Sequence, residues 1–305
     1  MSQSIKLTMG PFEWGLIIAL SLLWGSGFFM TELALDGVPP VTLAFSRVSL
    51  AALALYIIAK IMGYSLPRDR NIWIGLTIMS LFNNVAAYTL TFWGQTQITG
   101  SLASVFNATS PLFAILIAHA FLRDERLTAG KIIGVILGLG GVVVIVGFDA
   151  LKGLGLHVLA ELAVVGTALA YAIAVVYGRR FHAQPPIVTA AGQLIASSVI
   201  MLPIAAYFDQ FWLLDMPSTT AWIAILWIAL LSTAAAYLIF FRVLATSGAT
   251  NVILVTFLIP PSAILLGFVF LGERLEFQQV LGMVLIALGL LAIDGRAFGW
   301  FKQRL

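Results

Sequence analysis

Amide and hydroxyl side chains recur at helical spacing within one strongly apolar stretch of the chain. They are Thr77, Ser80, Asn84, Tyr88 and Thr91, with Asn83 beside them. Because residues three and four apart lie on one face of a helix, these side chains form a polar stripe. Burying an amide without a hydrogen-bond partner costs about 1–3 kcal/mol, so the stripe must face protein or water rather than lipid. It either binds a polar solute or holds helices together through hydrogen bonds.

The chain also offers aromatic and further polar groups in neighbouring apolar stretches. Ser104 and Asn107 share a helix face just beyond the stripe. Aromatic walls with a few polar groups suit a flat, partly apolar solute, although aromatic rings also simply pack helices. Taken together, these groups predict a substrate site made of Trp24, Asn83, Asn84, Tyr88, Ser104, Asn107, Tyr171 and Tyr237.

Two charged residues lie within apolar stretches and need a partner. An arginine at the centre of a membrane helix costs about 2.5–3.5 kcal/mol on insertion scales, so Arg47 either binds a substrate carboxylate or clamps neighbouring helices. Glu161 is a candidate proton site or amine contact, or it reaches the membrane interface. The scarcity of such carboxylates favours downhill movement of the solute, while Glu161 and Glu32 leave proton antiport open.

Several kinds of chemistry have no residues to support them. The chain has no cysteine, which excludes disulfides and thiolate chemistry, and no metalloprotease motif or phosphate-binding glycine loop. We therefore expect no metal, no cofactor and no ATP hydrolysis. Gly25-Ser26-Gly27 suggests a serine nucleophile, but no histidine lies deep within another apolar stretch. An intramembrane enzyme is the alternative of a different class, and we expect that the protein is not an enzyme.

The composition requires these groups to be positioned by membrane-spanning helices. Of 305 residues, 61% are hydrophobic and only 10% are charged, against about 25% charged in soluble proteins. A span needs about 20 apolar residues, and ten stretches qualify. They are 14–33, 41–62, 72–93, 100–122, 128–148, 156–177, 187–208, 221–246, 249–271 and 277–293. We expect an all-α integral membrane protein whose partners are the lipid bilayer and a small-molecule substrate.

The basic residues orient these ten spans. Thirteen of the sixteen Lys and Arg residues fall on the side of the termini, two fall on the other side, and Arg47 lies within a span. Positive charge marks cytoplasmic loops, so both termini are predicted to be cytoplasmic. The net charge of +3 is explained by this topology and indicates no nucleic-acid partner. The oligomeric state is left open.

The chain contains a repeat at an offset of 146 to 149 residues. Glu125-Arg126-Leu127 matches Glu273-Arg274-Leu275, and Trp73-Ile74 matches Trp222-Ile223. We expect a first five-helix repeat over residues 1–148 and a second over residues 149–305. Since five is odd, the second repeat enters the membrane inverted, which is typical of secondary transporters that work by alternating access around a central cavity.

Helix interruptions at matching places in the two repeats point to moving parts. Pro111 lies in the fourth span and Pro260 in the ninth, where each removes a backbone hydrogen bond. With Gly25 and Gly27 in the first span, they are predicted to act as hinges or gates; a packing kink is the alternative.

Motifs across both halves resemble the EamA-type branch of the drug/metabolite transporter superfamily. They include Leu23-Trp24-Gly25-Ser26-Gly27-Phe28, Pro39-Pro40 with Arg47, and Gly100 through Glu125-Arg126-Leu127 with Pro111. Within that branch the chain is most similar to the bacterial aromatic amino-acid exporters (YddG-like). The resemblance implies a basket of ten helices in the inner membrane that exports amino acids or related metabolites, without a covalent cofactor. Export of other drugs or metabolites, such as nucleobases, is the alternative.

Overall fold

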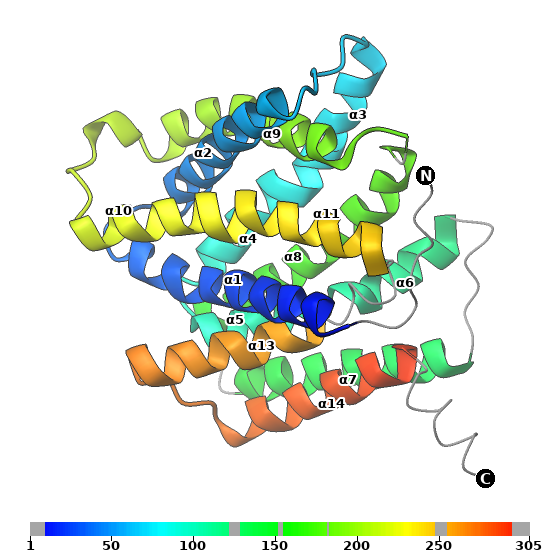
Figure 1. The fold of residues 1–305 in the computed structure, drawn as a ribbon. Helices are drawn as coiled ribbons and strands as arrows, with labels where there is room; N and C mark the ends of the chain where they lie inside the picture. The colour runs from blue at the N-terminus through cyan, green and yellow to red at the C-terminus, as the bar shows by residue number, and fades with distance from the viewer. Residues whose placement is uncertain (1–9, 122–128, 152–154, 182, 248–254, 295–305) are drawn as a thin grey trace.

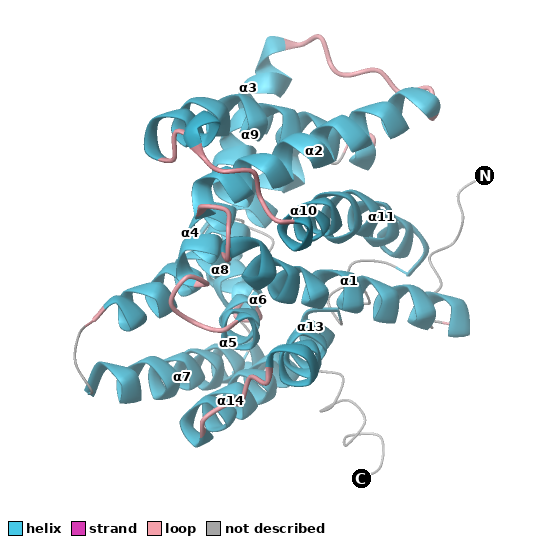
Figure 2. Ribbon diagram, turned by 90° about the vertical axis from the view of Figure 1, so that its left-hand side faces the viewer, coloured by secondary structure: helices cyan, strands magenta, loops and turns pink. Residues whose placement is uncertain are grey.

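The computed structural model describes residues 10–121, 129–151, 155–181, 183–247 and 255–294, and within these ranges it contains helices but no strand (Figures 1 and 2). Seven helical segments are long and apolar enough to cross a membrane, and three shorter apolar helices accompany them. The prediction of an all-helical protein is therefore confirmed. Each segment overlaps one predicted span, while the count of ten spans stays a prediction.

The first half of the chain forms five of these segments. They consist of α1 (Pro11–Leu35), α2 (Pro40–Ile61), α3 (Arg70–Ser80) continuing through η1 (Leu81–Ala86) into α4 (Ala87–Gly94), α5 (Gly100–Asn107) followed by α6 (Ser110–Phe121), and α7 (Ala129–Leu151).

The second half repeats this order. It consists of α8 (Leu156–Gly178) with η2 (Arg179–Phe181), α9 (Pro186–Phe208) with η3 (Phe211–Leu213), α10 (Thr219–Leu226) continuing through η4 (Trp227–Ala235) into α11 (Ala236–Ser247), α13 (Val255–Leu266) with η5 (Gly267–Leu271), and α14 (Phe277–Asp294).

Local sequence explains where several helices begin. Prolines occupy the first turn of α1, α2 and α9, where their missing amide hydrogen is not needed. The side chains of Asp69, Thr99 and Ser218 cap α3, α5 and α10 by accepting hydrogen bonds from backbone amides in the first turn. These caps fix the ends of the segments that carry the polar stripe and its neighbours.

Two segments depart from a regular α-helix at matching positions. The third and eighth segments are continuous, but each contains a π-helical stretch, η1 and η4, and these stretches end at Ala86 and Ala235. The repeat places Ala235 opposite Ala86. A π-helix adds one residue to a turn and is frequent at functional sites. Apolar composition carries no sign of this change, and the sequence did not predict it.

The helices pack in pairs that run across the two halves of the chain. α2 packs against α9, on the side of the bundle opposite α7 and α14 (Figures 1 and 2), while α1 packs on α13, and α5 and α6 pack on α8. α2 also contacts η4, while α3 and η1 contact α9. The last pair, α7 and α14, lies together along one side of the bundle in both views (Figures 1 and 2). The elements α2, α9, η1 and η4 thus bring the two halves of the chain into contact.

Glycines allow α7 and α14 to approach each other closely. A Cβ atom at Gly141 would lie 2.5 Å from the carbonyl oxygen of Gly282, and one at Gly289 would lie 2.5 Å from that of Gly134. Small residues at such contacts let helix backbones pack together inside membranes.

The glycine contact predicts a stability loss at one position and not at its neighbour. We expect Gly141→Val to lower stability by about 1–3 kcal/mol, because the new side chain must push α14 away. Gly140→Val is the matched control, since no atom lies within 4 Å of a Cβ atom there. Thermal unfolding in detergent should show a lower midpoint for the Gly141 variant only. Equal midpoints for the two variants would contradict the close contact.

Candidate functional site

A cluster of hydrogen-bonded polar and aromatic side chains lies where α2, α9, η1 and η4 meet. We call it the central polar cluster and define it by six residues: Arg47, Asn83, Tyr88, Gln193, Thr233 and Tyr237. Both halves of the chain contribute to it. The local π-helical turns of η1 and η4 carry Asn83 and Thr233.

Asn83 connects three helical segments through one amide group. Its Nδ2 atom donates to Gln193 Oε1 at 3.0 Å and to the Tyr237 hydroxyl at 3.2 Å. Gln193 Nε2 in turn donates to the Tyr237 hydroxyl at 3.4 Å. The side-chain oxygen of Asn83 accepts no hydrogen bond from any residue that the structure describes. It therefore remains available to accept a hydrogen bond from a solute.

Arg47 has an unusual set of neighbours for a cation within a membrane helix. Its Nε atom donates to Thr233 Oγ1 at 2.9 Å, and its guanidinium lies 4.0 Å from the centre of the Tyr88 ring. Among the described residues, no carboxylate lies within 4 Å of it. A cation over an aromatic ring gains about 0.5–2 kcal/mol, which does not neutralise its charge. The hydrogen bond to Thr233 joins α2 to η4, so the helix-clamping role of Arg47 and the binding of a substrate carboxylate both stay open at this point.

Asn84 lies beside the cluster and is fully buried. Its Nδ2 atom donates to Ser197 Oγ at 3.0 Å, while its Oδ1 atom is buried without a partner among the described residues. Ser197 donates to the backbone oxygen of Gln193, one turn earlier on α9. The contact supports the helix-joining role of this asparagine, and it also positions the Gln193 backbone beneath the cluster.

Three of the four predicted aromatic residues lie around the cluster. Tyr88 and Tyr171 meet edge to face with ring centres 6.5 Å apart, and Tyr237 stacks on Phe241. Trp24 lies in a neighbouring apolar group, where its ring contacts Phe240. An additional indole, Trp227, donates to Ser26 Oγ at 2.9 Å. The hydroxyl of Ser26 is thereby engaged with tryptophan and with the Leu23 carbonyl.

The remaining predicted polar residues lie away from the cluster. Ser104 is fully buried in α5 and donates to the carbonyl of Ser101. Asn107 is at the end of the same helix, and its Oδ1 atom has no partner in the part of the chain that the structure describes. Glu161 is fully buried in α8, with His157 Nε2 3.8 Å away across one turn. No described contact links these three side chains to Arg47 or Asn83.

The predicted hinge residues have different surroundings. Pro111 follows a break between α5 and α6 at Ala108–Thr109, whereas Pro260 lies inside the continuous helix α13. A Cβ atom at Gly25 would lie 2.6 Å from that of Ser262, so Gly25 is a contact point between α1 and α13. Gly27 faces Ser232 with room for a methyl group. Only Pro111 coincides with an interruption of the helix.

The sequence did not predict that Gln193 and Thr233 meet the stripe residues directly. The repeat offered a signal, because it pairs Arg47 with Gln193 and places Thr233 opposite Asn84. Polar groups at matching depths in both halves converge when the halves pack face to face. Two pockets of the described structure lie away from the cluster, one beside Glu273 and one beside Tyr56.

Comparison with known families gives one match that covers most of the chain. The EamA-like transporter family matches twice, over residues 13–147 and 158–293. A solved structure named only "Crystal structure of protein" is similar over 95% of this chain and 98% of its own length, with a TM-score of 0.68 and 22% identity. The structural likeness concerns the fold alone.

Individual relatives cover nearly the full chain at moderate identity. "Uncharacterized transporter YoaV" of Bacillus subtilis is 26% identical, over 90% of this chain and 94% of its own. "Probable terminal-alkyne amino-acid exporter" of Streptantibioticus cattleyicolor is 27% identical, over 94% of each chain. "Uncharacterized inner membrane transporter YedA" of Escherichia coli K12 is 25% identical, over 93% and 92%. These names describe transporters rather than enzymes.

Proposed function

Because the chain belongs to the EamA-like transporter family and is a multi-pass membrane protein, we propose that it is a secondary transporter that exports amino acids, aromatic and other neutral ones in particular, across the inner membrane. The central polar cluster is the substrate site. The single observation that carries this assignment is Arg47, a cation among aromatic rings with no carboxylate partner among the described residues.

The cluster has a complementary group for each of the three parts of an α-amino acid, namely its carboxylate, its ammonium group and its side chain. The carboxylate of the substrate binds the terminal nitrogens of Arg47, since charge-assisted and bidentate pairs are the strong ones. The ammonium group donates to the side-chain oxygen of Asn83, and the side chain of the substrate lies against Tyr88 and Tyr171. The amino-acid exporter among the relatives supports the same substrate class.

The packing of the helices supports alternating access by two inverted halves. Several contacts between the halves have a counterpart: α1 on α13 corresponds to α8 on α6, and α2 on η4 corresponds to α9 on η1. Such pairing is expected for two repeats, residues 1–148 and 149–305, related by an axis in the membrane plane. Exchange of the two conformations would expose the central polar cluster to each side in turn. The break before Pro111 is the favoured bending point.

The proposal predicts release of amino acids from cells that express the protein. Cells fed a phenylalanine-containing dipeptide should release free phenylalanine several-fold faster than cells with an empty vector. Chromatography of the medium measures this release, and membrane fractionation controls for expression. Release of nucleobases from cells fed nucleosides, without any release of amino acids, would instead support export of other metabolites.

A further inference from the structure

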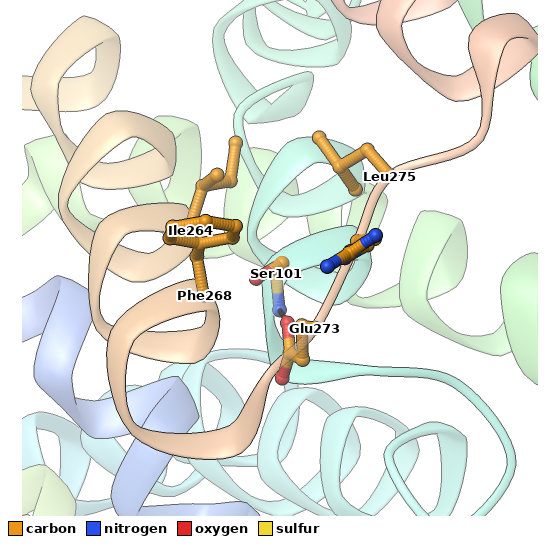
Figure 3. Close-up of a pocket in the computed structure, with 6 residues that line it drawn as sticks. Ser101, Ile264, Phe268, Glu273 and Leu275 are labelled. Carbon is orange, nitrogen blue, oxygen red and sulfur yellow. Dashed lines mark hydrogen bonds between the residues drawn. The ribbon is translucent and has the colours of Figure 1, made fainter.

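Outside the central polar cluster, two carboxylates meet at the first turn of α5. The amide of Gly100 donates to Glu32 Oε2 at 2.9 Å, and the next amide, that of Ser101, donates to Glu273 Oε2 at 3.2 Å. Glu32 comes from α1, and Glu273 comes from the connection between η5 and α14. Figure 3 shows Glu273 pointing from this connection toward Ser101, beside a pocket of about 230 Å³. The two acids therefore join three segments at one end of the bundle.

The surroundings supply too little positive charge for two ionised carboxylates. Consecutive amides hold them close together, and the two side chains interact with each other. A helix N-terminus acts as about half a positive charge. Among the described residues, no basic group lies within 4 Å of either acid. At this end of the elements packed here, the other charged or titratable groups are Asp36, His157, Glu161, Glu276 and Arg274, and Arg274 lines the same pocket as Glu273.

Unpartnered oxygens around the pair indicate a missing hydrogen or cation. Glu273 Oε1, Gln95 Oε1 and Ser101 Oγ are each buried without a hydrogen-bond partner among the described residues. Gln95 and Ser101 are only 6% and 2% exposed. Ser101 Oγ and Glu273 Oε2 both lie within 2.6 Å of the position that a Cβ atom on Gly267 would occupy. The oxygens of Ser101 and Glu273 therefore lie against η5.

We propose that Glu32 and Glu273 form a proton-binding site that holds the outer end of the transporter closed by sharing one proton between them. Two carboxylates in contact cannot both ionise without strong repulsion, and sharing a proton removes it. With one proton the pair carries a single negative charge, which the N-terminus of α5 stabilises. This inference rests on the proposed function, and it adds a proton site to the transport cycle.

The repeat makes this site one-sided. The offset that pairs Trp24 with Tyr171 pairs Glu32 with Arg179, while Glu273 corresponds to Glu125. By sequence, the matching position at the other end therefore carries opposite charges rather than two acids. Proton dependence is expected at the predicted external end only.

The direction of the pH effect follows from the proton count. When this end of the transporter is closed, the Glu32–Glu273 pair binds one proton. When it opens, the two carboxylates separate, become hydrated and ionise, so the proton is released. Low pH therefore favours the closed end, and raising the external pH favours opening, by up to about tenfold per pH unit for one proton. The pocket lies directly beside Glu273, one of the residues that line it (Figure 3).

The absence of native cysteine allows a direct test with single introduced cysteines. Ala103→Cys places a thiol on fully buried α5 beneath the two acids, and Gln97→Cys places one on the exposed connection before α5. The full chain in liposomes is treated with a membrane-impermeant thiol reagent at external pH about 6 and about 8. The ratio of labelling at position 103 to that at position 97 removes the pH dependence of the reagent itself.

We expect this ratio to increase several-fold with pH in the otherwise native chain. It should change less than about twofold in Glu32→Gln and Glu273→Gln, while Glu276→Gln, in the same connection, keeps the native response. A ratio independent of pH in the native chain, an unchanged response in both glutamine variants, or a response to sodium in place of pH would overturn the proposal. Amino-acid counterflow at constant symmetric pH tests the proposed function separately, so the two failures are distinguishable.

Discussion

Arg47→Gln is expected to remove the transporter's preference for an amino acid over the corresponding amide. Under the proposed function the guanidinium binds the substrate carboxylate, and a hydrogen bond to a charged group contributes about 1.5–3 kcal/mol. Since about 1.4 kcal/mol corresponds to a tenfold change, phenylalanine should compete with labelled substrate roughly 10- to 100-fold better than phenylalaninamide. In the variant the two compounds should compete equally.

Glutamine is the informative replacement because the repeat places Gln193 opposite Arg47. It keeps a polar group that can still bond Thr233, and it avoids an empty space in α2. Thermal stability of the variant should be close to native, because replacing a desolvated charge by a neutral group is often neutral or stabilising. If Arg47→Gln unfolds the protein, or if it weakens the acid and the amide equally, Arg47 is a structural clamp.

Asn83→Ala is expected to remove the preference for a substrate that carries an ammonium group over the corresponding compound that lacks it. The native chain should favour phenylalanine over 3-phenylpropanoate by roughly 10- to 100-fold, since the side-chain oxygen of Asn83 accepts a hydrogen bond from a charged donor. The variant leaves Gln193 and Tyr237 bonded to each other at 3.4 Å, so the cluster should persist. Competition against labelled phenylalanine in liposomes measures both ratios.

Asn71→Ala serves as the matched control for this variant. Asn71 is exposed in the first turn of α3, and only its backbone amide is used, in the cap formed by Asp69. This control should transport like the native chain. If Asn83→Ala keeps the native preference for a substrate with an ammonium group, Asn83 does not bind the substrate.

Much of the fold followed from the sequence because membrane spans depend on composition over about 20 residues. The all-helical architecture and the family resemblance are confirmed. Helices α5 and α9 begin at Gly100 and Pro186, within one residue of the predicted starts of the spans 100–122 and 187–208. By contrast, the π-helical stretches η1 and η4 depend on a shift of hydrogen bonding by one residue, which leaves no mark on composition.

The proposed site could be predicted only in part from the sequence. Helical spacing assigns residues to one face of a helix, but it does not identify the neighbouring helix that packs against that face. Asn83, Tyr88 and Tyr237 were predicted as site residues and lie together, whereas Ser104 and Asn107 share the composition and lie elsewhere. The contact between the acids at Glu32 and Glu273 joins opposite ends of the chain. Only the packing of α1, α5 and η5 brings them to two consecutive amides, those of Gly100 and Ser101.

The most direct measurement of the central claim is counterflow in liposomes that contain the purified chain. Vesicles loaded with unlabelled phenylalanine are diluted into labelled phenylalanine, with no ATP and no ion or pH gradient. A transporter that works by alternating access should produce a transient accumulation of label inside, and Arg47→Gln should reduce it. A folded, reconstituted chain that accumulates no label for phenylalanine or any other amino acid would contradict the proposed function.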